Sequence, residues 1–242
     1  MQIDFYEEFP DYKNLKKLNL IKFPSRLFIA EKSIENFQKW EKYVRKINKK
    51  VKCIYWSVID NSYWISPFSN TKDLNELFTD LKKIENPILI DLEFPLKKKM
   101  ILKNLFSFFK NKRIIEDFFK KNKKRITTAQ YPLSHISFFQ KILGLNYNIK
   151  THKSLMWYSS MNSEKLNKKI KKELTKIKNK EDYSVSLGTI AVGVLGNEPI
   201  LLPEKLEKNL EFVKDKGFNR VIIFRLEGLN REYLNVINKF IK

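Results

Sequence analysis

The sequence predicts an α/β fold of the (β/α)8 type, a TIM barrel in which eight parallel strands lie inside an outer ring of helices. Short apolar or alternating segments typical of strands occur eight times, and each is followed by a segment with helical spacing of apolar residues. The 242 residues leave no spare linker in a barrel of roughly 250 residues. We therefore expect one domain over residues 1–242. An open doubly wound sheet is the alternative, but no GxGxxG or GxxxxGK[ST] motif follows the first strand.

The first half of the chain is expected to contain strands at residues 2–9, 26–30, 51–57 and 86–95. Asp11 and Ser33 are placed to cap the helices after the first two strands. The loop at 58–71 holds several large aromatic residues, which either pack over the barrel mouth or contact a ligand. Asp73 begins the next helix.

The second half is expected to contain strands at residues 125–130, 154–158, 183–189 and 220–226. One long basic and aromatic helical region is predicted over 95–122. Gly144 ends the helix after the fifth strand. Pro203 opens a helix that Gly217 closes, and Asn230 starts the last helix.

The composition limits the partners. The net charge is +21, mostly from lysines spread over nearly every predicted helix, so a solvated surface explains most of it and nucleic acid is expected only as a non-specific partner. The single cysteine, Cys53, excludes an internal disulfide and favours a reducing, cytoplasmic setting. Two histidines are too few for a His-rich zinc or iron site. No cofactor, metal, secretory leader or membrane partner is expected.

Two acids end the fourth expected strand, in the segment NPILIDLEFP at residues 86–95. Side chains alternate along a strand, so Asp91 and Glu93 share a face with Leu89. The carboxyl ends of barrel strands converge on the site of barrel enzymes. Asp91 and Glu93 are therefore the candidate catalytic pair. The structural alternative is a strand end whose acids meet only lysine or solvent.

Other polar and aromatic residues near strand ends are candidate substrate contacts. They combine carboxylates, tyrosines and tryptophans, a mixture that suits sugars, because carboxylates serve as acid, base or nucleophile at a glycosidic bond. The substrate is accordingly expected to be an oligosaccharide or another small molecule. The set comprises Asp4, Tyr6 and Glu8, Gln130, Tyr158, Arg225 and Glu227, with Trp56 and Trp64 as stacking surfaces.

Two short segments carry a family resemblance. DLEFP at 91–95 resembles the end of the fourth-strand signature of the chitinase family of retaining glycoside hydrolases, and MWY at 156–158 resembles its sixth-strand motif. The resemblance implies that Glu93 protonates the leaving oxygen. It also implies that Asp91 orients the N-acetyl group of the substrate, which acts as nucleophile, and that Tyr158 bonds to this group. The chain departs from the pattern at Ser159, where the family has aspartate, and lacks the second-strand S-x-G-G.

Three other functions fit parts of the sequence. Glycines 188, 193, 196 and 228 beside Arg225 would suit a phosphorylated metabolite, with Lys32 as a Schiff-base amine, although such glycines also serve tight turns. Asp4 with the fourth-strand acids would suit hydrolysis assisted by a divalent metal. A non-catalytic barrel that binds carbohydrate, nucleic acid or protein is the third alternative.

Overall fold

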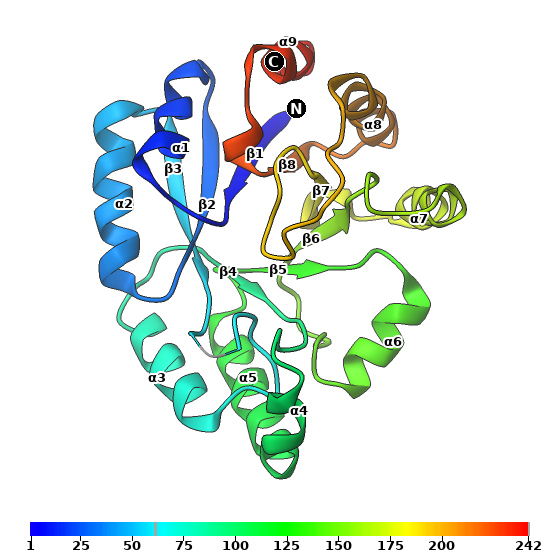
Figure 1. Cartoon of the computed structure of the whole chain (residues 1–242). Coiled ribbons are helices and arrows are strands. Elements are labelled where there is room, and N and C mark those ends of the chain that lie inside the picture. The colour runs from blue at the N-terminus through cyan, green and yellow to red at the C-terminus, as the bar shows by residue number, and fades with distance from the viewer. Residues whose placement is uncertain (61, 242) are drawn as a thin grey trace.

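The strands close into a ring at the centre of the molecule (Figure 1). The computed structural model describes residues 1–60 and 62–241. Neighbouring strands pair in parallel and in chain order, and β1 closes the barrel against β8. The (β/α)8 prediction is thereby confirmed. The strands are β1 (Gln2–Glu7), β2 (Ser25–Glu31), β3 (Val51–Ser57), β4 (Ile88–Asp91), β5 (Ile126–Gln130), β6 (His152–Trp157), β7 (Tyr183–Gly188) and β8 (Arg220–Phe224).

Helices surround the ring, and both chain termini lie on the same side of it (Figure 1). Their bounds are α1 (Tyr12–Lys16), α2 (Ile34–Ile47), α3 (Thr71–Leu81), α4 (Lys99–Lys103), α5 (Phe108–Asn122), α6 (Ser134–Ile142), α7 (Glu164–Lys176), α8 (Pro203–Asp215) and α9 (Arg231–Asn238). Short 3-10 turns are η1 (Lys17–Leu20), η2 (Leu105–Ser107), η3 (Lys180–Asp182) and η4 (Leu226–Gly228). None of the helices in the described part of the chain has the length and apolar character needed to cross a bilayer.

Helix starts follow local chemistry. The Asp11 side chain accepts a hydrogen bond from the Asn14 backbone N–H (2.6 Å), and Asn230 does the same for Tyr233 (3.1 Å). Pro203 occupies the first turn of α8. The helical region predicted over 95–122 is present, and it is divided into α4, η2 and α5.

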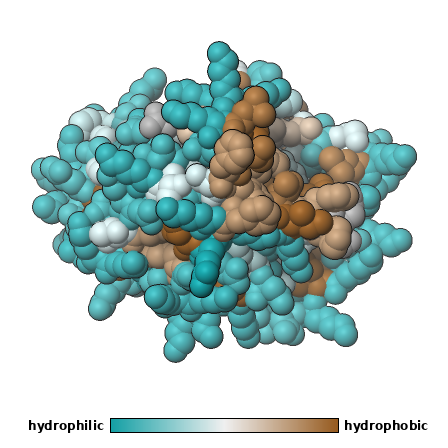
Figure 2. All heavy atoms as spheres, turned by 90° about the horizontal axis from the view of Figure 1, so that it is seen from below, coloured by the Kyte–Doolittle hydropathy of each residue, from teal (hydrophilic) through white to brown (hydrophobic). Residues whose placement is uncertain are grey.

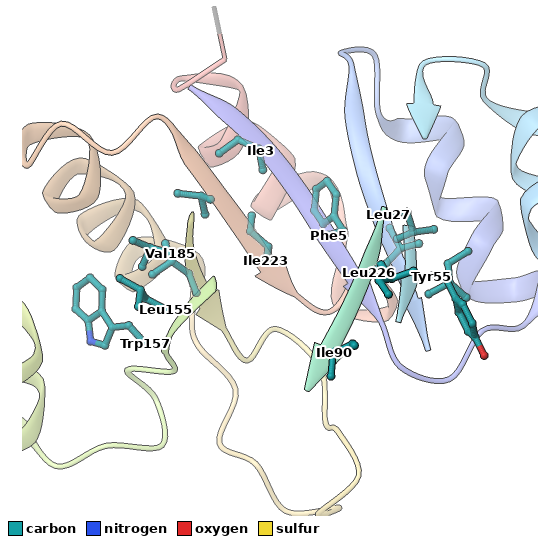
Figure 3. Packing of buried hydrophobic residues seen from close by; sticks show 14 of the residues in the cluster. Ile3, Phe5, Leu27, Tyr55, Ile90, Leu155, Trp157, Val185, Ile223 and Leu226 are labelled. Carbon is teal, nitrogen blue, oxygen red and sulfur yellow. The ribbon is translucent and has the colours of Figure 1, made fainter. Parts of the chain in front are cut away.

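Most strands bury side chains on both faces. Figure 3 shows side chains that pack between the strands and the helices, including Ile3 and Phe5 of β1 and Ile223 of β8. The alternate residues point into the barrel, where Tyr6 and Trp56 belong to a separate buried cluster. Such double burial is typical of a parallel barrel. It leaves the carboxyl ends of the strands as the place where polar side chains can gather.

Candidate active site

A cavity of about 100 Å³ lies at the carboxyl ends of the strands. Its wall combines acids with aromatic rings and a few apolar side chains. Four of the lining residues are carboxylic acids, namely Glu8, Asp91, Glu93 and Glu198, and four are aromatic residues with a polar atom, namely Trp56, Trp64, Tyr131 and Tyr158. This composition is unlike that of the barrel interior below it, which is mostly apolar.

The backbone of β4 explains why Asp91 and Glu93 share the cavity. Leu89 belongs to the inner cluster, so Asp91, two residues later, also points inward. The chain remains extended beyond the strand, because the Ile65 N–H donates to the Asp91 carbonyl (3.1 Å) and Leu92 bridges to Ile65. Alternation therefore continues to Glu93. The sequence predicted this shared face.

Burial and mutual repulsion perturb these acids. Burial first, then the charges of Glu93 and Glu8, raise the pKa of Asp91 well above its usual range. Burial and the neighbouring Glu8 raise the pKa of Glu93 to about 7. Within the described residues, neither acid forms an ion pair. The cavity thus favours the protonated form of at least one carboxyl group near neutral pH.

Glu8 adds a third perturbed carboxyl group to the cavity. Burial is the main reason why its pKa rises to about 7, against the opposing effect of a hydrogen bond donated by the Tyr63 hydroxyl. Tyr63 lies in the aromatic loop after β3, at the residue before Trp64. This loop therefore positions one acid and supplies one ring of the cavity wall.

Aromatic residues form the sides and floor of the site. Trp56 lines the cavity, and its buried Nε1–H has no hydrogen-bond partner among the described residues. Below it, the Tyr6 ring contacts Trp56 edge to face, with 5.5 Å between centroids. The Tyr6 hydroxyl is hydrogen-bonded to Ser154 (2.9 Å) and Ser186 (3.1 Å). Tyr6 therefore supports the floor and is not part of the cavity lining.

Two expected contacts lie elsewhere. Asp4 points into the barrel but sits one layer lower, where the Arg26 guanidinium binds it at 2.7 Å. Gln130 faces the helices, because Ala129 is the residue paired with the inward Asp91. Its amide donates to Asn146 (3.0 Å). Neither side chain is among the residues that line the cavity.

Arg225 and Glu227 are also outside the cavity lining. The Arg225 guanidinium forms an ion pair with buried Glu7 (2.7 Å), donates to the Val192 carbonyl (2.8 Å) and contacts Glu227. Glu7 faces away from the barrel interior, since Tyr6 faces into it. These contacts indicate a buried structural network that holds the loop after β7 against β1.

Lys32 and Asp4, the residues suggested for a Schiff base and for a divalent metal, do not line this cavity. Lys32 is exposed, pairs with Asp60 and lines a different cavity, of about 210 Å³, between α2 and α3. Asp4 is separated from the fourth-strand acids by its lower layer. Among the described residues, no group of three His, Cys, Asp or Glu side chains has an arrangement suited to a metal ion.

The cavity also contains residues that the sequence analysis missed. Glu198 lies in the loop between β7 and α8, where its Oε1 accepts from the Leu195 N–H (3.1 Å) and its Oε2 is buried without a partner among the described residues. A Cβ on Gly193 would lie 2.8 Å from both Glu198 and Glu8. The glycine therefore lets two acids approach the same point. An acid within a glycine-containing loop was the only signal in the sequence.

Together, the fold and this cavity define a TIM barrel with an acidic, aromatic mouth. No family model matches the chain, and no curated protein does. Solved structures do match: the C-terminal domain of a putative chitinase from Desulfitobacterium hafniense (TM-score 0.60, 9% identity, 100% of this chain and 99% of that one) and a class V chitinase from Nicotiana tobaccum (0.56, 10%, 98% and 99%). The IolI protein, described with a bound zinc atom, matches too (0.51, 14%, 100% of both chains). At such identities the likeness shows the barrel fold alone.

Proposed function

We propose that the protein is a glycoside hydrolase, with Glu93 as general acid and Asp91 as its partner. The observation that carries the proposal is that two carboxyl groups, the buried Asp91 and the half-buried Glu93, line one cavity at the strand ends. A general acid needs a pKa near the working pH, and the pKa of Glu93 is raised to about 7. The neighbouring chitinase structures support a carbohydrate substrate.

The unpartnered polar atoms of the cavity suit a polyhydroxylated ligand. Asp91 Oδ1 and Glu198 Oε2 are acceptors, whereas Trp56 Nε1–H is a donor. A buried polar group without a partner costs about 1–3 kcal/mol. Sugar hydroxyl groups both donate and accept, so one ring could satisfy both kinds of atom. Trp64 offers an aromatic face for stacking.

The proposed chemistry begins with protonated Glu93. Its proton passes to the glycosidic oxygen as the bond to the anomeric carbon breaks, and a nearby carboxylate stabilises the positive charge that develops. Asp91, whose own pKa is also raised, takes that role in its ionised form. By the chitinase resemblance, an N-acetyl group of the substrate would be the nucleophile, with Asp91 and Tyr158 holding it.

Entry of a sugar requires the mouth to widen. The cavity volume of about 100 Å³ is below the roughly 300 Å³ of small ligand pockets. The loop after β3, which carries Trp64, and the loop after β7, which carries Leu195, form the walls that could separate. Movement of such loops is a common step in barrel enzymes.

A phosphorylated substrate is less compatible with this cavity. The loop after β7 brings the carboxyl groups of Glu8 and Glu198 to Gly193, and a phosphate there would meet like charge. Arg225, the nearby cation, is already engaged by Glu7 and Glu227.

Hydrolysis of a panel of fluorogenic β-glycosides, N-acetylglucosamine oligomers included, would test the proposal. We expect Glu93→Gln to lose at least about a hundredfold in kcat, the usual scale of general acid catalysis, with the fold retained. The matched control is Glu31→Gln, since Glu31 ends β2 on the helix side and accepts from Trp40 Nε1 (2.7 Å), which glutamine can also do. If Glu93→Gln keeps full activity, the assignment is wrong. Carbohydrate binding without turnover in the wild type would indicate the non-catalytic barrel.

A further inference from the structure

An exposed apolar surface covers α4, η2, the start of α5 and the outer side of α6. Phe106 is 99% exposed, Phe109 81% and Leu102 77%. Leu105, Phe138, Phe139 and Ile142 are exposed as well. Figure 2 views the molecule from the side of α4 and α5 and shows hydrophobic side chains gathered in a raised area among hydrophilic ones. Such a group on a protein surface marks an interaction site.

The two parts of this surface are joined. Lys112 of α5 donates from Nζ to the carbonyl groups of Lys141 and Ile142 at the end of α6 (3.2 and 3.1 Å). Phe109 lies one turn before Lys112, and Phe138 lies one turn before Ile142. The phenylalanines of the two helices therefore belong to one face.

Packing of the barrel does not account for these side chains. No residue of α4 or η2 is buried. The segment is held instead by Asn104, whose amide donates to the Phe68 carbonyl (3.1 Å). One buried polar residue thus fixes a turn in which Leu102, Leu105 and Phe106 are exposed.

The same region carries most of the positive charge. Residues 94–163 contain fifteen Lys or Arg and only two acids, Glu116 and Asp117, which gives +13 of the total +21. Five lysines border the apolar residues and are exposed, namely Lys97, Lys98, Lys99, Lys103 and Lys110. None of these five forms an ion pair in the part of the chain that the structure describes. The charge is therefore free to act on a partner.

We propose that this apolar, lysine-bordered surface binds peripherally to a bilayer that contains anionic phospholipid. Exposed Phe and Leu side chains enter the boundary between headgroups and acyl chains, and lysines beside them attract the anionic headgroups. A second copy of the chain fits less well, because a twofold contact would bring the same lysines together. Nucleic acid would use the lysines but leave the aliphatic side chains in water. This contact is peripheral, and it departs from the expectation that the protein has no membrane partner.

Co-flotation of the full chain with vesicles tests the proposal. We expect binding to phosphatidylcholine vesicles that include phosphatidylserine, little binding to phosphatidylcholine alone, and weaker binding as salt rises. Phe106→Ser with Phe109→Ser should weaken binding at least about tenfold, since each side chain loses its transfer from water. Both side chains are exposed, so the variant should keep the wild-type circular dichroism and melting temperature.

Two triple variants test the contribution of the lysines to vesicle binding. Glutamine at Lys97, Lys98 and Lys99 should weaken binding by up to about a hundredfold, since each lysine near an anionic surface contributes about 1 kcal/mol. The same change at the exposed α7 residues Lys165, Lys169 and Lys172 should have a smaller effect, although it removes the same net charge.

Insertion itself can be observed with Phe106→Trp, whose fluorescence should be quenched by brominated acyl chains in anionic vesicles. The proposal is overturned if the wild type ignores phosphatidylserine at low salt, or if binding survives loss of both phenylalanines. It is also overturned if the phenylalanines instead support a dimer in sedimentation or binding to single-stranded DNA.

Discussion

Replacement of Glu93 by glutamine should change how stability depends on pH. Burial and Glu8 raise the pKa of Glu93 from 4.5 to about 7 in the folded protein. At 1.36 kcal/mol per unit, this difference corresponds to at most about 3 kcal/mol, an upper limit because part of the side chain remains accessible to solvent. The native state binds this proton more tightly than the unfolded chain does. The stabilisation is therefore complete below the unfolded pKa and is lost as the pH rises through about 7.

Urea denaturation followed by circular dichroism, at constant ionic strength and a series of pH values, measures the effect. Glutamine does not titrate, so the stability of Glu93→Gln relative to the wild type should rise by up to about 3 kcal/mol between about pH 4 and about pH 8. Glu31→Gln is the control, because it replaces a strand-end glutamate on the opposite side of the barrel wall. Its curve shows what the loss of a strand-end carboxyl group outside the cavity does to stability.

The direction of the effect makes this prediction decisive for the site. If wild type and Glu93→Gln have parallel curves, Glu93 titrates as an ordinary exposed acid and does not share a dry cavity with Glu8. If the variant becomes less stable than the wild type as the pH rises, Glu93 is stabilised as an anion by a cation. Either result refutes a general acid at this position.

Three further substitutions test the structural assignments. Asp4→Asn should lower the free energy of unfolding by about 3 kcal/mol, because the Arg26 charge then lacks its carboxylate partner. Any hydrolytic rate of the folded protein should stay unchanged. A lost rate with unchanged stability would show that Asp4 belongs to the site. Gly228→Ala should cost at least about 3 kcal/mol, since its Cβ would lie 1.7 Å from the Ile190 carbonyl oxygen. At Gly196 no atom lies within 4 Å of such a Cβ, so there alanine should cost only the about 1–2 kcal/mol of its left-handed backbone. Equal losses at the two glycines, measured by urea denaturation, would contradict this packing.

The barrel was predictable because its signals are local and repeated. Each strand is a short apolar run followed by a helix with its own start signal, such as Ser33, whose side chain accepts from the Asn36 N–H (3.2 Å). Parallel pairing follows from that alternation. The division of 95–122 was not predictable in the same way. It depends on a contact between Asn104 and Phe68, which are 36 residues apart.

The alternation of side chains along a strand predicted the position of Asp91 and Glu93, but not of every residue expected at the cavity. It predicts the face of a residue only within an extended segment, and it succeeded for Asp91 and Glu93 because Leu92 pairs with Ile65 beyond the strand end. It placed Asp4 inward correctly, but it does not show that the residue lies in a lower layer. Gln130 lies on the helix side, because the register across β4 and β5 pairs Ala129 with the inward Asp91.

Glu198 shows the remaining limit. It lies in a loop, where no periodicity relates a side chain to the strands, and its position depends on the fold of residues 189–202. The Leu201 N–H donates to the Thr189 carbonyl (2.6 Å), which closes that loop over the mouth. Only the assembled barrel brings Glu198 to Glu8. Loop residues of an enzyme site are therefore the part that a single sequence predicts least.

The buried acids of this protein fall into two groups, and the difference bears on function. Asp4 and Glu7 are fully buried, and each has an arginine at 2.7 Å. Asp91 and Glu8 are buried to a similar degree without an ion pair among the described residues. A raised pKa does not separate the two groups, because burial also raises the pKa of Glu7 to about 7. A buried carboxyl group without a cation lowers stability, so packing alone does not explain its presence. Perturbed acids in a cavity are typical of catalytic sites, and this contrast within one barrel is the strongest reason to test the mouth for chemistry.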